Sequence, residues 1–304
     1  MNTQTSQPWQ NYLVNEEDGD RTTVNVGQKG FVKLVDVMPG NIPNSVSDEV
    51  RCDFAIVQAA RVSYGDGTKK TSTDKGLIRY LLRNRHTSPF EMVELKFHIK
   101  APIFVTRQWL RHRTASVNEI SARYSVMKDE FHHIDFIRKQ SESNKQCSDP
   151  NDKSLEEDAE AVDLMSDFNK TTDKSYEIYT KLIEKGVSRE VARMHLPVSL
   201  MTEFFWKIDL HNLYHFLNLR MDPHAQEEIR DFANAIYDMV KELCPVSSQA
   251  FMEYNVNKVT LGTNEIESVR NKSNVLLSAT LEPVENKREQ AEYSYKLKKL
   301  GLEF

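Results

Sequence analysis

The chain has 304 residues, of which 39% are hydrophobic and 28% are charged, a composition typical of a globular enzyme with one large domain or two small ones. Its formal net charge of −5 argues against general nucleic-acid binding, because a basic surface supplies most of that affinity. Any site for an anionic ligand must therefore be local.

The segment 1–23 is polar and lacks the apolar region that an export signal requires. No run of the sequence approaches the ~20 apolar residues that cross a bilayer. Cys52, Cys147 and Cys244 are far apart and have neither metal-binding nor redox spacing. We therefore expect a cytoplasmic protein that keeps its thiols reduced and binds no membrane.

The beginning of the chain predicts a strand and a helix after a disordered segment. Residues 1–28 are polar and without hydrophobic periodicity, so they are expected to be disordered. Residues 31–37 alternate apolar and polar side chains as a strand does. Apolar residues then recur at helical spacing over 47–63, where Ser47 or Asp48 can cap the helix.

The next segments predict a helix over 72–86, a strand over 92–102, a helix over 102–112 and a strand over 118–126. The strand over 92–102 has the clearest pattern, because apolar and charged side chains alternate along it. Its apolar face carries Val93, Leu95, Phe97 and Ile99. Pro102 suits the first turn of the following helix.

The second half predicts mainly helices. Around residues 138–163 the sequence is acidic and poor in apolar residues, so we expect an inserted, solvated loop that runs into a helix. Further segments are helices at 178–184, from Ser188, at 212–221 and at 227–244, and an apolar stretch at 198–208. Strands and helices mix without βαβ regularity, which favours an α+β catalytic domain over 29–265 with a charged helical extension over 266–304.

Residues 107–126, RQWLRHRTASVNEISARYSV, combine arginines with apolar residues such as Trp109 and Leu110 that a solvated basic patch would not need. On a helix, Arg107 and Arg111 lie one turn apart. Arginine suits phosphate or carboxylate, because it donates two parallel, charge-assisted hydrogen bonds. The pattern predicts a local anion site, and the alternative is a surface ion-pair network with structural arginines.

On the strand expected after that helix, Glu119, Ser121 and Arg123 would share one polar face. The opposite, inward face would carry Ile120, Ala122 and Tyr124. The polar face would add a hydroxyl donor and a carboxylate acceptor to the arginines. This geometry suggests an anionic ligand with a polar ring but does not identify one.

A second constellation lies in residues 209–228. If this segment is helical, His211 and His215 lie one turn apart on one face, a spacing found in zinc sites. A zincin requires glutamate directly after the first histidine, and Asn212 stands there instead. The surrounding hydrophobic residues favour half-buried, hydrogen-bonded histidines, so we predict no metal site.

No nucleophile stands out from the sequence. There is no Gly-x-Ser-x-Gly elbow and no Walker loop, and the chain has only 10 glycines, so a phosphate-cradling loop or dinucleotide fingerprint is not expected. Cys244 precedes Pro245 at a helix end, where burial is expected rather than reactivity. Chemistry would have to rest on a bound cofactor.

The segment RHRTASVNEIS, residues 111–121, resembles the signature of the flavin-dependent thymidylate synthases, which is Arg-His-Arg, seven residues and Ser. Further blocks follow in the family's order. They are HTSPFE at 86–91, RQW at 107–109, ARYS at 122–125, LP at 196–197 and NLRMDPHAQ at 218–226. One tripeptide would be a weak signal, but the ordered blocks are specific, and the resemblance covers about residues 30–255.

This resemblance implies a single mixed α/β domain with a central sheet flanked by helices, assembling as a homotetramer with active sites shared between subunits. It implies conversion of dUMP to dTMP with 5,10-methylenetetrahydrofolate as carbon donor, NADPH as electron source and FAD as hydride carrier. The family uses no enzyme cysteine to attack the pyrimidine, which agrees with the lack of a Pro-Cys-His segment here.

The resemblance also assigns site residues by position. For dUMP these are Gln108, Trp109, Leu110, Arg111, Glu119, Ile120, Ser121, Ala122, Arg123, Arg193 and Arg220. For FAD they are His86, Ser88, Arg111, His112, Arg113, Glu119, Asp209, Leu210, His211, His215 and His224. Many members have Asn-x-Arg and a further Asn where this chain has Asp209, His211 and His215, and an aspartate beside FAD would have to accept hydrogen bonds.

Arg220 resembles the catalytic arginine of the family. A guanidinium at the N3 edge of uracil would stabilise the charge that builds on the ring as C5 attacks the methylene donor, a contribution of ~3–4 kcal/mol. Ser121 has no evident base partner and is interpreted as a binding donor. Two other classes are a metal-dependent hydrolase using His211 and His215, and a nucleotide-binding regulatory protein, which would have no evident need for Arg220.

Overall fold

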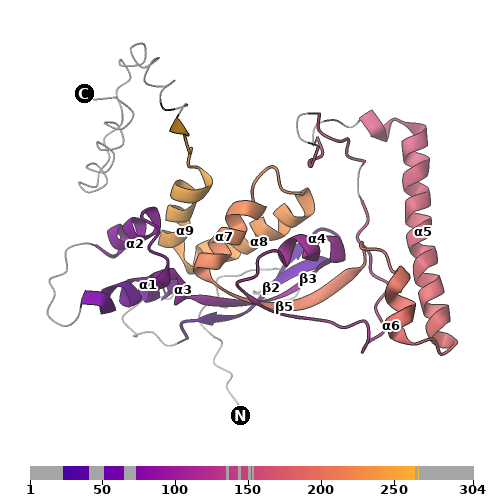
Figure 1. Cartoon of the computed structure of the whole chain (residues 1–304), viewed down its shortest axis with the longest axis horizontal. Coiled ribbons are helices and arrows are strands. Elements are labelled where there is room, and N and C mark those ends of the chain that lie inside the picture. The colour runs from indigo at the N-terminus through magenta and orange to yellow at the C-terminus, as the bar shows by residue number, and fades with distance from the viewer. Residues whose placement is uncertain are drawn as a thin grey trace. The chain divides into compact units, whose positions relative to one another are not determined.

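The computed structural model describes residues 23–40, 51–64, 73–134, 137–142, 145–149, 152, 154–263 and 266. The chain forms two compact units, Met1–Met252 and Glu253–Phe304. In the second unit the described residues include the end of a π-helical turn, Met252–Val256, and an irregular segment after it. The first unit carries all the other described elements, most of which are labelled in Figure 1.

The first unit is built on a five-stranded sheet with the order β1-β2-β3-β5-β4, in which all neighbouring strands are antiparallel. The strands are β1 (Thr23–Val26), β2 (Gly30–Met38), β3 (Glu94–Pro102), β4 (Ser116–Glu119) and β5 (Met201–Asp209). At Gly30 a Cβ would lie 2.6 Å from the Val26 carbonyl oxygen and 2.8 Å from the Phe232 ring. Glycine therefore lets helix α8 approach the first hairpin closely.

One face of the sheet is apolar and covered by helices. On β3 the buried side chains are those of Leu95, Phe97 and Ile99, and β5 buries Phe204, Trp206 and Ile208. Helices α4, α7 and α8 lie over this face (Figure 1). Along β3 and β5, side chains that point to the helices are buried and those between them are more exposed, which is the period-two pattern of an antiparallel sheet covered on one face.

The helices of the first unit are α1 (Arg51–Arg61), α2 (Asp74–Arg83), α3 (Ser88–Glu91), α4 (Ile103–Trp109), α5 (Ala159–Glu184), α6 (Arg189–Ala192), α7 (Leu210–Arg220), α8 (Glu227–Leu243) and α9 (Pro245–Phe251). Short 3-10 turns are Val62–Tyr64, Ser154–Glu156 and Arg193–His195. Side-chain oxygens of Thr73, Asp158 and Asp209 accept backbone N–H groups and cap α2, α5 and α7. None of the described helices is long and apolar enough to span a membrane.

A buried carboxylate ties α1 to α9. Asp53 accepts the backbone N–H groups of Val246 at 2.7 Å and Ser247 at 3.0 Å. Burial raises the pKa of Asp53, while these hydrogen bonds act in the opposite direction. The carboxylate therefore satisfies the first N–H groups of α9, which have no partner inside the helix.

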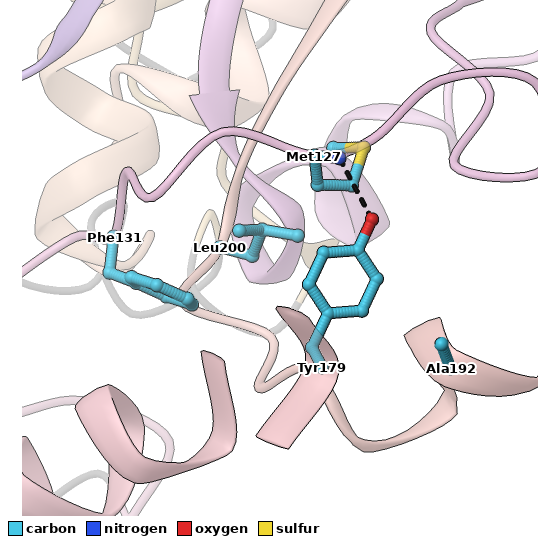
Figure 2. Close-up of a cluster of buried hydrophobic side chains, with 5 residues drawn as sticks. All are labelled: Met127, Phe131, Tyr179, Ala192 and Leu200. Carbon is cyan, nitrogen blue, oxygen red and sulfur yellow. Dashed lines mark hydrogen bonds between the residues drawn. The ribbon is translucent and has the colours of Figure 1, made fainter. Parts of the chain in front are cut away.

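A second apolar cluster holds α5 and α6 against the segment that follows β4. Its buried members are Met127, Phe131, Tyr179, Ala192 and Leu200, shown in Figure 2. The Met127 N–H donates to the Tyr179 hydroxyl at 2.9 Å, the dashed line in Figure 2. This cluster fixes the path of the chain between residues 121 and 131, where several expected site residues lie.

The structure confirms the α+β class, the strands expected at 31–37 and 92–102, and the helices expected at 72–86 and 227–244. The helix expected over 102–112 ends at Trp109, with Pro102 as its N-cap. The acidic segment runs into a helix as expected, and this helix, α5, is continuous from Ala159 through the helix expected at 178–184. The apolar stretch at 198–208 is a central strand, β5.

The first strand and the first helix differ in how they agree with the expectations from the sequence. Residues 23–26 form β1, inside the segment 1–28 that we expected to be disordered. The helix expected over 47–63 is confirmed as α1, but its expected caps, Ser47 and Asp48, lie outside the described residues, as do residues 1–22 and most of the expected extension 266–304.

Candidate active site

Arg220 ends helix α7 and joins it to the end of α4. Its Nε donates to Nε2 of His112 at 3.1 Å, and its Nη2 donates to the backbone oxygen of Gln108, also at 3.1 Å. The Gln108 carbonyl belongs to the last turn of α4, where carbonyl groups have no partner inside the helix. The Gln108 side chain in turn donates to Oε1 of Gln226 at 2.6 Å, at the N-cap of α8.

The imidazole of His112 is uncharged at neutral pH. Burial, the Arg220 charge and the neighbouring His215 lower the pKa of His112 from 6.5 to about 4. Its ring lies edge-on to Phe216 at 5.0 Å between centroids and to His215 at 5.6 Å. Neutral imidazole can accept a hydrogen bond, so the protonation state fits the bond from Arg220.

Three arginines close to His112 in the sequence have exposed side chains and no acidic partner among the described residues. Arg107, Arg111 and Arg113 form no ion pair with any residue in the described part of the chain. Arg111 is near enough to Arg220 to lower its pKa, after the larger effect of burial. A surface ion-pair network therefore does not account for these arginines, and their free donors suit an anionic ligand.

The predicted strand face of Glu119, Ser121 and Arg123 is wrong. Strand β4 pairs with β5 and ends at Glu119, and the next residues form a turn in which the N–H groups of Tyr124 and Ser125 both donate to the Ser121 carbonyl at 3.0 Å. The expected inward face is also wrong for Ile120 and Tyr124, which are 42% and 77% exposed. A turn does not alternate its side chains, so the period-two argument fails here.

The turn residues contact other elements. Glu119 accepts a hydrogen bond from the Thr202 hydroxyl at 2.6 Å, while Arg123 pairs with Glu190 of α6 at 3.2 Å. Arg193, half-buried, begins the 3-10 turn after α6. Arg123 is therefore the one arginine of this segment to which the ion-pair alternative applies among the described residues.

The expected flavin positions fall at several helix ends. His86 is exposed between α2 and α3, and Ser88 is exposed at the first position of α3. Asp209 uses its carboxylate to cap α7, accepting the Asn212 backbone N–H at 2.9 Å and the Asn212 amide at 2.7 Å. His224 is exposed and its Nδ1 lies 2.8 Å from Asp222.

Two expected contacts are buried. The side chains of Trp109 and Leu210 are fully buried in the core, so only their backbones could touch a ligand. The Leu210 N–H already donates to the Val93 carbonyl at 2.8 Å. Trp109 packs against Phe216 with ring centroids 4.9 Å apart, and Phe216 in turn contacts the His112 ring.

The expected site residues fall into two groups within one chain. Arg220, Gln108 and His112 form one group, with Arg111 and His215 beside it. The turn after β4 forms the other, where Arg189 donates to the Tyr124 carbonyl and Glu190 pairs with Arg123. Arg193 begins the turn that follows the same helix, α6. Over the residues that the structure covers, no hydrogen bond or ion pair joins the two groups.

The sequence alone did not single out Gln226 or Thr202. Gln226 lies in the NLRMDPHAQ block, which could have marked it, while a strand threonine such as Thr202 gives no signal. The metal alternative lacks a further ligand, because no group of three or more His, Cys, Asp or Glu side chains in the described ranges could hold an ion.

Comparison with known proteins decides the family. The family described as thymidylate synthase complementing protein matches residues 46–246. The chain belongs to this family. A flavin-dependent thymidylate synthase from Dictyostelium discoideum is 50% identical over 282 residues, covering 92% of this chain and 88% of that protein. One from Thermus thermophilus is 52% identical over 248 residues, covering 82% and 85%.

Solved structures of the same fold include a UMP/dUMP methylase from Streptomyces cacaoi bound with 5-Br dUMP. It is 30% identical to this chain with a TM-score of 0.63, and the match covers 77% of this chain and 99% of the methylase. The same methylase bound with 5-Br UMP gives 31% identity and the same TM-score, 0.63. Membership in the thymidylate synthase complementing family agrees with the order of the sequence blocks.

Proposed function

We propose that this chain is a flavin-dependent thymidylate synthase that converts dUMP to dTMP and holds the nucleotide beside Arg220. The observation that carries the proposal is the Arg220 guanidinium, fixed at one edge by His112 and the Gln108 carbonyl, with the unpaired Arg111 close by. Relatives about half identical over most of both chains bear the name of this activity. The methylase of the same fold bears 5-Br dUMP.

The dUMP site is proposed to draw on both groups of residues. Arg111, Arg123 and Arg193 would bind the phosphate and sugar together with Ser121 and the segments 108–111 and 119–123, because guanidinium forks match phosphate oxygens. Binding phosphate at Arg123 would compete with its exposed ion pair to Glu190, which is a weak interaction in solvent.

Arg220 would act at the pyrimidine ring. Its positive charge at the N3 edge favours loss of the N3 proton and stabilises negative charge on the ring as C5 attacks the carbon donor. Its pKa is lowered by burial, yet a guanidinium stays charged at neutral pH because its ordinary pKa is so high. A charged group preorganised in a half-buried site needs little rearrangement during the reaction.

The donor set fits FAD. Arg113, Arg111 and the exposed His86, Ser88 and His224 could donate to the diphosphate and ring oxygens, with His112, His211 and His215 beside them. Asp209 and Leu210 could contribute through the backbone, since the Asp209 carboxylate already caps α7. When bound, the flavin would supply the hydride, with NADPH as reductant and 5,10-methylenetetrahydrofolate as carbon donor.

No thiol of this chain is poised to attack the pyrimidine. Cys52 and Cys244 are buried, and burial raises the pKa of Cys244 well above its ordinary value. The Cys147 sulfur donates to the His224 carbonyl at 3.2 Å. These contacts support a mechanism without an enzyme nucleophile.

We further propose a homotetramer whose copies complete one another's sites, since the two groups of site residues are not joined within one chain. Helix α5 offers an exposed apolar stripe, in which Leu164, Phe168 and Ile178 are 65%, 46% and 44% exposed. The stripe borders a groove of about 740 Å³ that also contacts His195 and Pro197. Large exposed apolar surfaces mark protein interfaces.

We propose the α5 helix of a second copy as the occupant of this stripe. If two α5 helices pair antiparallel about a twofold axis at Thr171, Leu164 of one copy lies beside Ile178 of the other. The same axis brings Asp167 of one copy beside Lys174 of the other. An isologous contact of this kind repeats each favourable pair twice, and spacing of three and four residues along the stripe is that of paired helices.

Replacing Phe168 with lysine is expected to break the tetramer into smaller species, because it puts a charge at the centre of the stripe. Light scattering after size-exclusion chromatography measures the mass. Val62→Lys is the matched control, since Val62 is also an exposed hydrophobic residue but lies after α1, outside the stripe. A tetrameric Phe168→Lys protein, or a monomeric wild type, would contradict the proposed interface.

The visible spectrum of the purified protein tests the activity. We expect flavin bands that bleach under anaerobic NADPH, and that bleach faster when dUMP is present, with dTMP formed once methylenetetrahydrofolate is added. Coupling of bleaching to dUMP would link the cofactor to the nucleotide site. A protein that stays colourless after addition of FAD would overturn the proposed function, and a metal assay would then test the hydrolase alternative.

A further inference from the structure

Arg220 is held along one edge of its guanidinium group. The Nε–H and one N–H of Nη2 point the same way in a guanidinium group, and these are the two donors bonded to His112 and to the Gln108 carbonyl. The opposite edge, formed by Nη1 and Nη2, has no partner among the residues that the structure describes. Two parallel N–H groups are therefore left for a ligand.

The two acceptors that hold Arg220 are both uncharged. One is a backbone carbonyl, and the other is an imidazole whose pKa is lowered to about 4 by burial and by Arg220 and His215. No described carboxylate bonds to Arg220. A carboxylate in place of His112 would orient the guanidinium equally well. It would also offset the positive charge that is proposed to stabilise the pyrimidine ring.

His112 is itself held by two contacts, one of its backbone and one of its ring. Its backbone N–H donates to the Trp109 carbonyl at 3.0 Å, and its ring edge packs on Phe216, with centroids 5.0 Å apart and planes 74° apart. Phe216 is fully buried against Trp109 and Trp206. Aromatic edge-to-face packing of this kind limits rotation of the ring, so the acceptor atom keeps its direction.

We propose that His112 is a positioning residue that aims the free Nη1–Nη2 edge of Arg220 at the pyrimidine while leaving the arginine its full charge. The inference rests on the proposed function, since it names a residue of the same site. It separates His112 from the unpaired arginines beside it, whose exposed guanidinium groups are expected to bind ligand directly. His112 acts through Arg220, whatever contact it makes with the flavin.

Two variants of the full chain, loaded with FAD, test this role. His112→Phe keeps a flat ring on Phe216 but has no acceptor for the Arg220 Nε–H. His112→Gln keeps an acceptor oxygen at a similar reach. We expect His112→Phe to lower kcat for dTMP formation by about tenfold to a hundredfold, the size of effect that small misplacement of a reacting group produces. In His112→Phe the KM for dUMP and the FAD content should change little. The kcat of His112→Gln should remain within about fivefold of the wild-type value.

A second readout does not depend on turnover. The nucleotide 5-fluoro-dUMP has a more acidic N3 than dUMP, and loss of its N3 proton changes its ultraviolet absorbance. Bound to the wild type or to His112→Gln, it should lose this proton at a lower pH than when bound to His112→Phe. The shift reports the charge that Arg220 places at the ring.

The outcomes separate the inference from the proposed function. Wild-type kcat and an unchanged 5-fluoro-dUMP titration in His112→Phe would overturn the positioning role. Equal loss of FAD from both variants would also overturn it, because His112 would then be a flavin contact alone. If the wild type forms no dTMP, the proposed function fails, and the 5-fluoro-dUMP titration still decides whether His112 positions Arg220.

Discussion

Replacing Arg220 with alanine is expected to lower dTMP formation by at least a hundredfold, the effect of removing one preorganised donor from a developing charge, which is ~10²–10³ in rate. The reason lies in the geometry. The free Nη1–Nη2 edge is the only part of Arg220 without a partner among the described residues, so the substitution removes the group that would meet the pyrimidine.

Flavin should remain bound in the Arg220→Ala protein, because most of the proposed flavin contacts lie elsewhere. The measurement is single-turnover dTMP formation together with the visible spectrum, which reports FAD content separately. Arg220→Lys is expected to lose most of the activity too, since lysine keeps the charge but cannot bond His112 and a ring edge at once.

The matched control for this prediction is Arg61→Ala, which removes an arginine paired with Asp74 on the surface of α1. Its kcat should equal that of the wild type. Turnover within a few-fold of wild type in Arg220→Ala would remove Arg220 from the mechanism. Loss of both FAD and activity would instead point to a collapsed site, and a thermal unfolding curve would then show whether the fold is intact.

Elements with one buried face can be predicted from their own sequence. Elements whose position depends on pairing with a strand far away in the sequence cannot. The strand β3 was predicted because burial on one side of an antiparallel sheet imposes alternation on its own residues. Strand β4 carries four exposed residues, so no hydrophobic pattern marks it. Its register with Phe204 to Lys207 of β5 determines where it ends, and that pairing cannot be read from local sequence.

The same limit applies to the candidate site. His112 and Arg220 are 108 residues apart, and no spacing rule predicts a hydrogen bond over that separation. The resemblance to a family named both residues but not the contact between them. The sequence predicts a helix at the end of the acidic segment and a helix at 178–184, but it does not show that both belong to one helix, α5. Leu164 and Phe168 lie between the two and continue the helical stripe.

Replacing Arg138 with alanine is expected to destabilise the protein by about 3–5 kcal/mol, the cost of removing one partner from a largely buried ion pair. Arg138 begins the acidic segment and donates to Glu227 at 2.7 Å and to Glu228. The side chains of Arg138 and Glu228 are only 15% and 12% exposed. For a domain of this size, the midpoint of thermal unfolding should fall by about 10 °C.

The pH dependence of this loss follows from Glu228. Burial favours its neutral form, but hydrogen bonds from His132 and Arg138 lower its pKa from 4.5 to about 2. A carboxylate with a lowered pKa contributes stability above pH 4.5, and this contribution is lost as the pH falls toward 2. Without Arg138, protonation of Glu228 removes the cost of a buried, uncompensated charge. The difference in the free energy of unfolding between wild type and variant should therefore become smaller as the pH falls from about 5 to about 3.

Circular dichroism melts at pH 7 and pH 4 measure both effects. Lys241→Ala is the control, because its ion pair with Asp238 lies on the same helix but is exposed on both sides, and such pairs contribute about 0–1 kcal/mol. Adding Glu228→Gln to Arg138→Ala should recover much of the loss, since no buried charge then remains. An Arg138→Ala protein that melts within a degree or two of wild type would contradict this prediction. The contacts of Arg138 with Glu227 and Glu228 would then not stabilise the attachment of the acidic segment to α8.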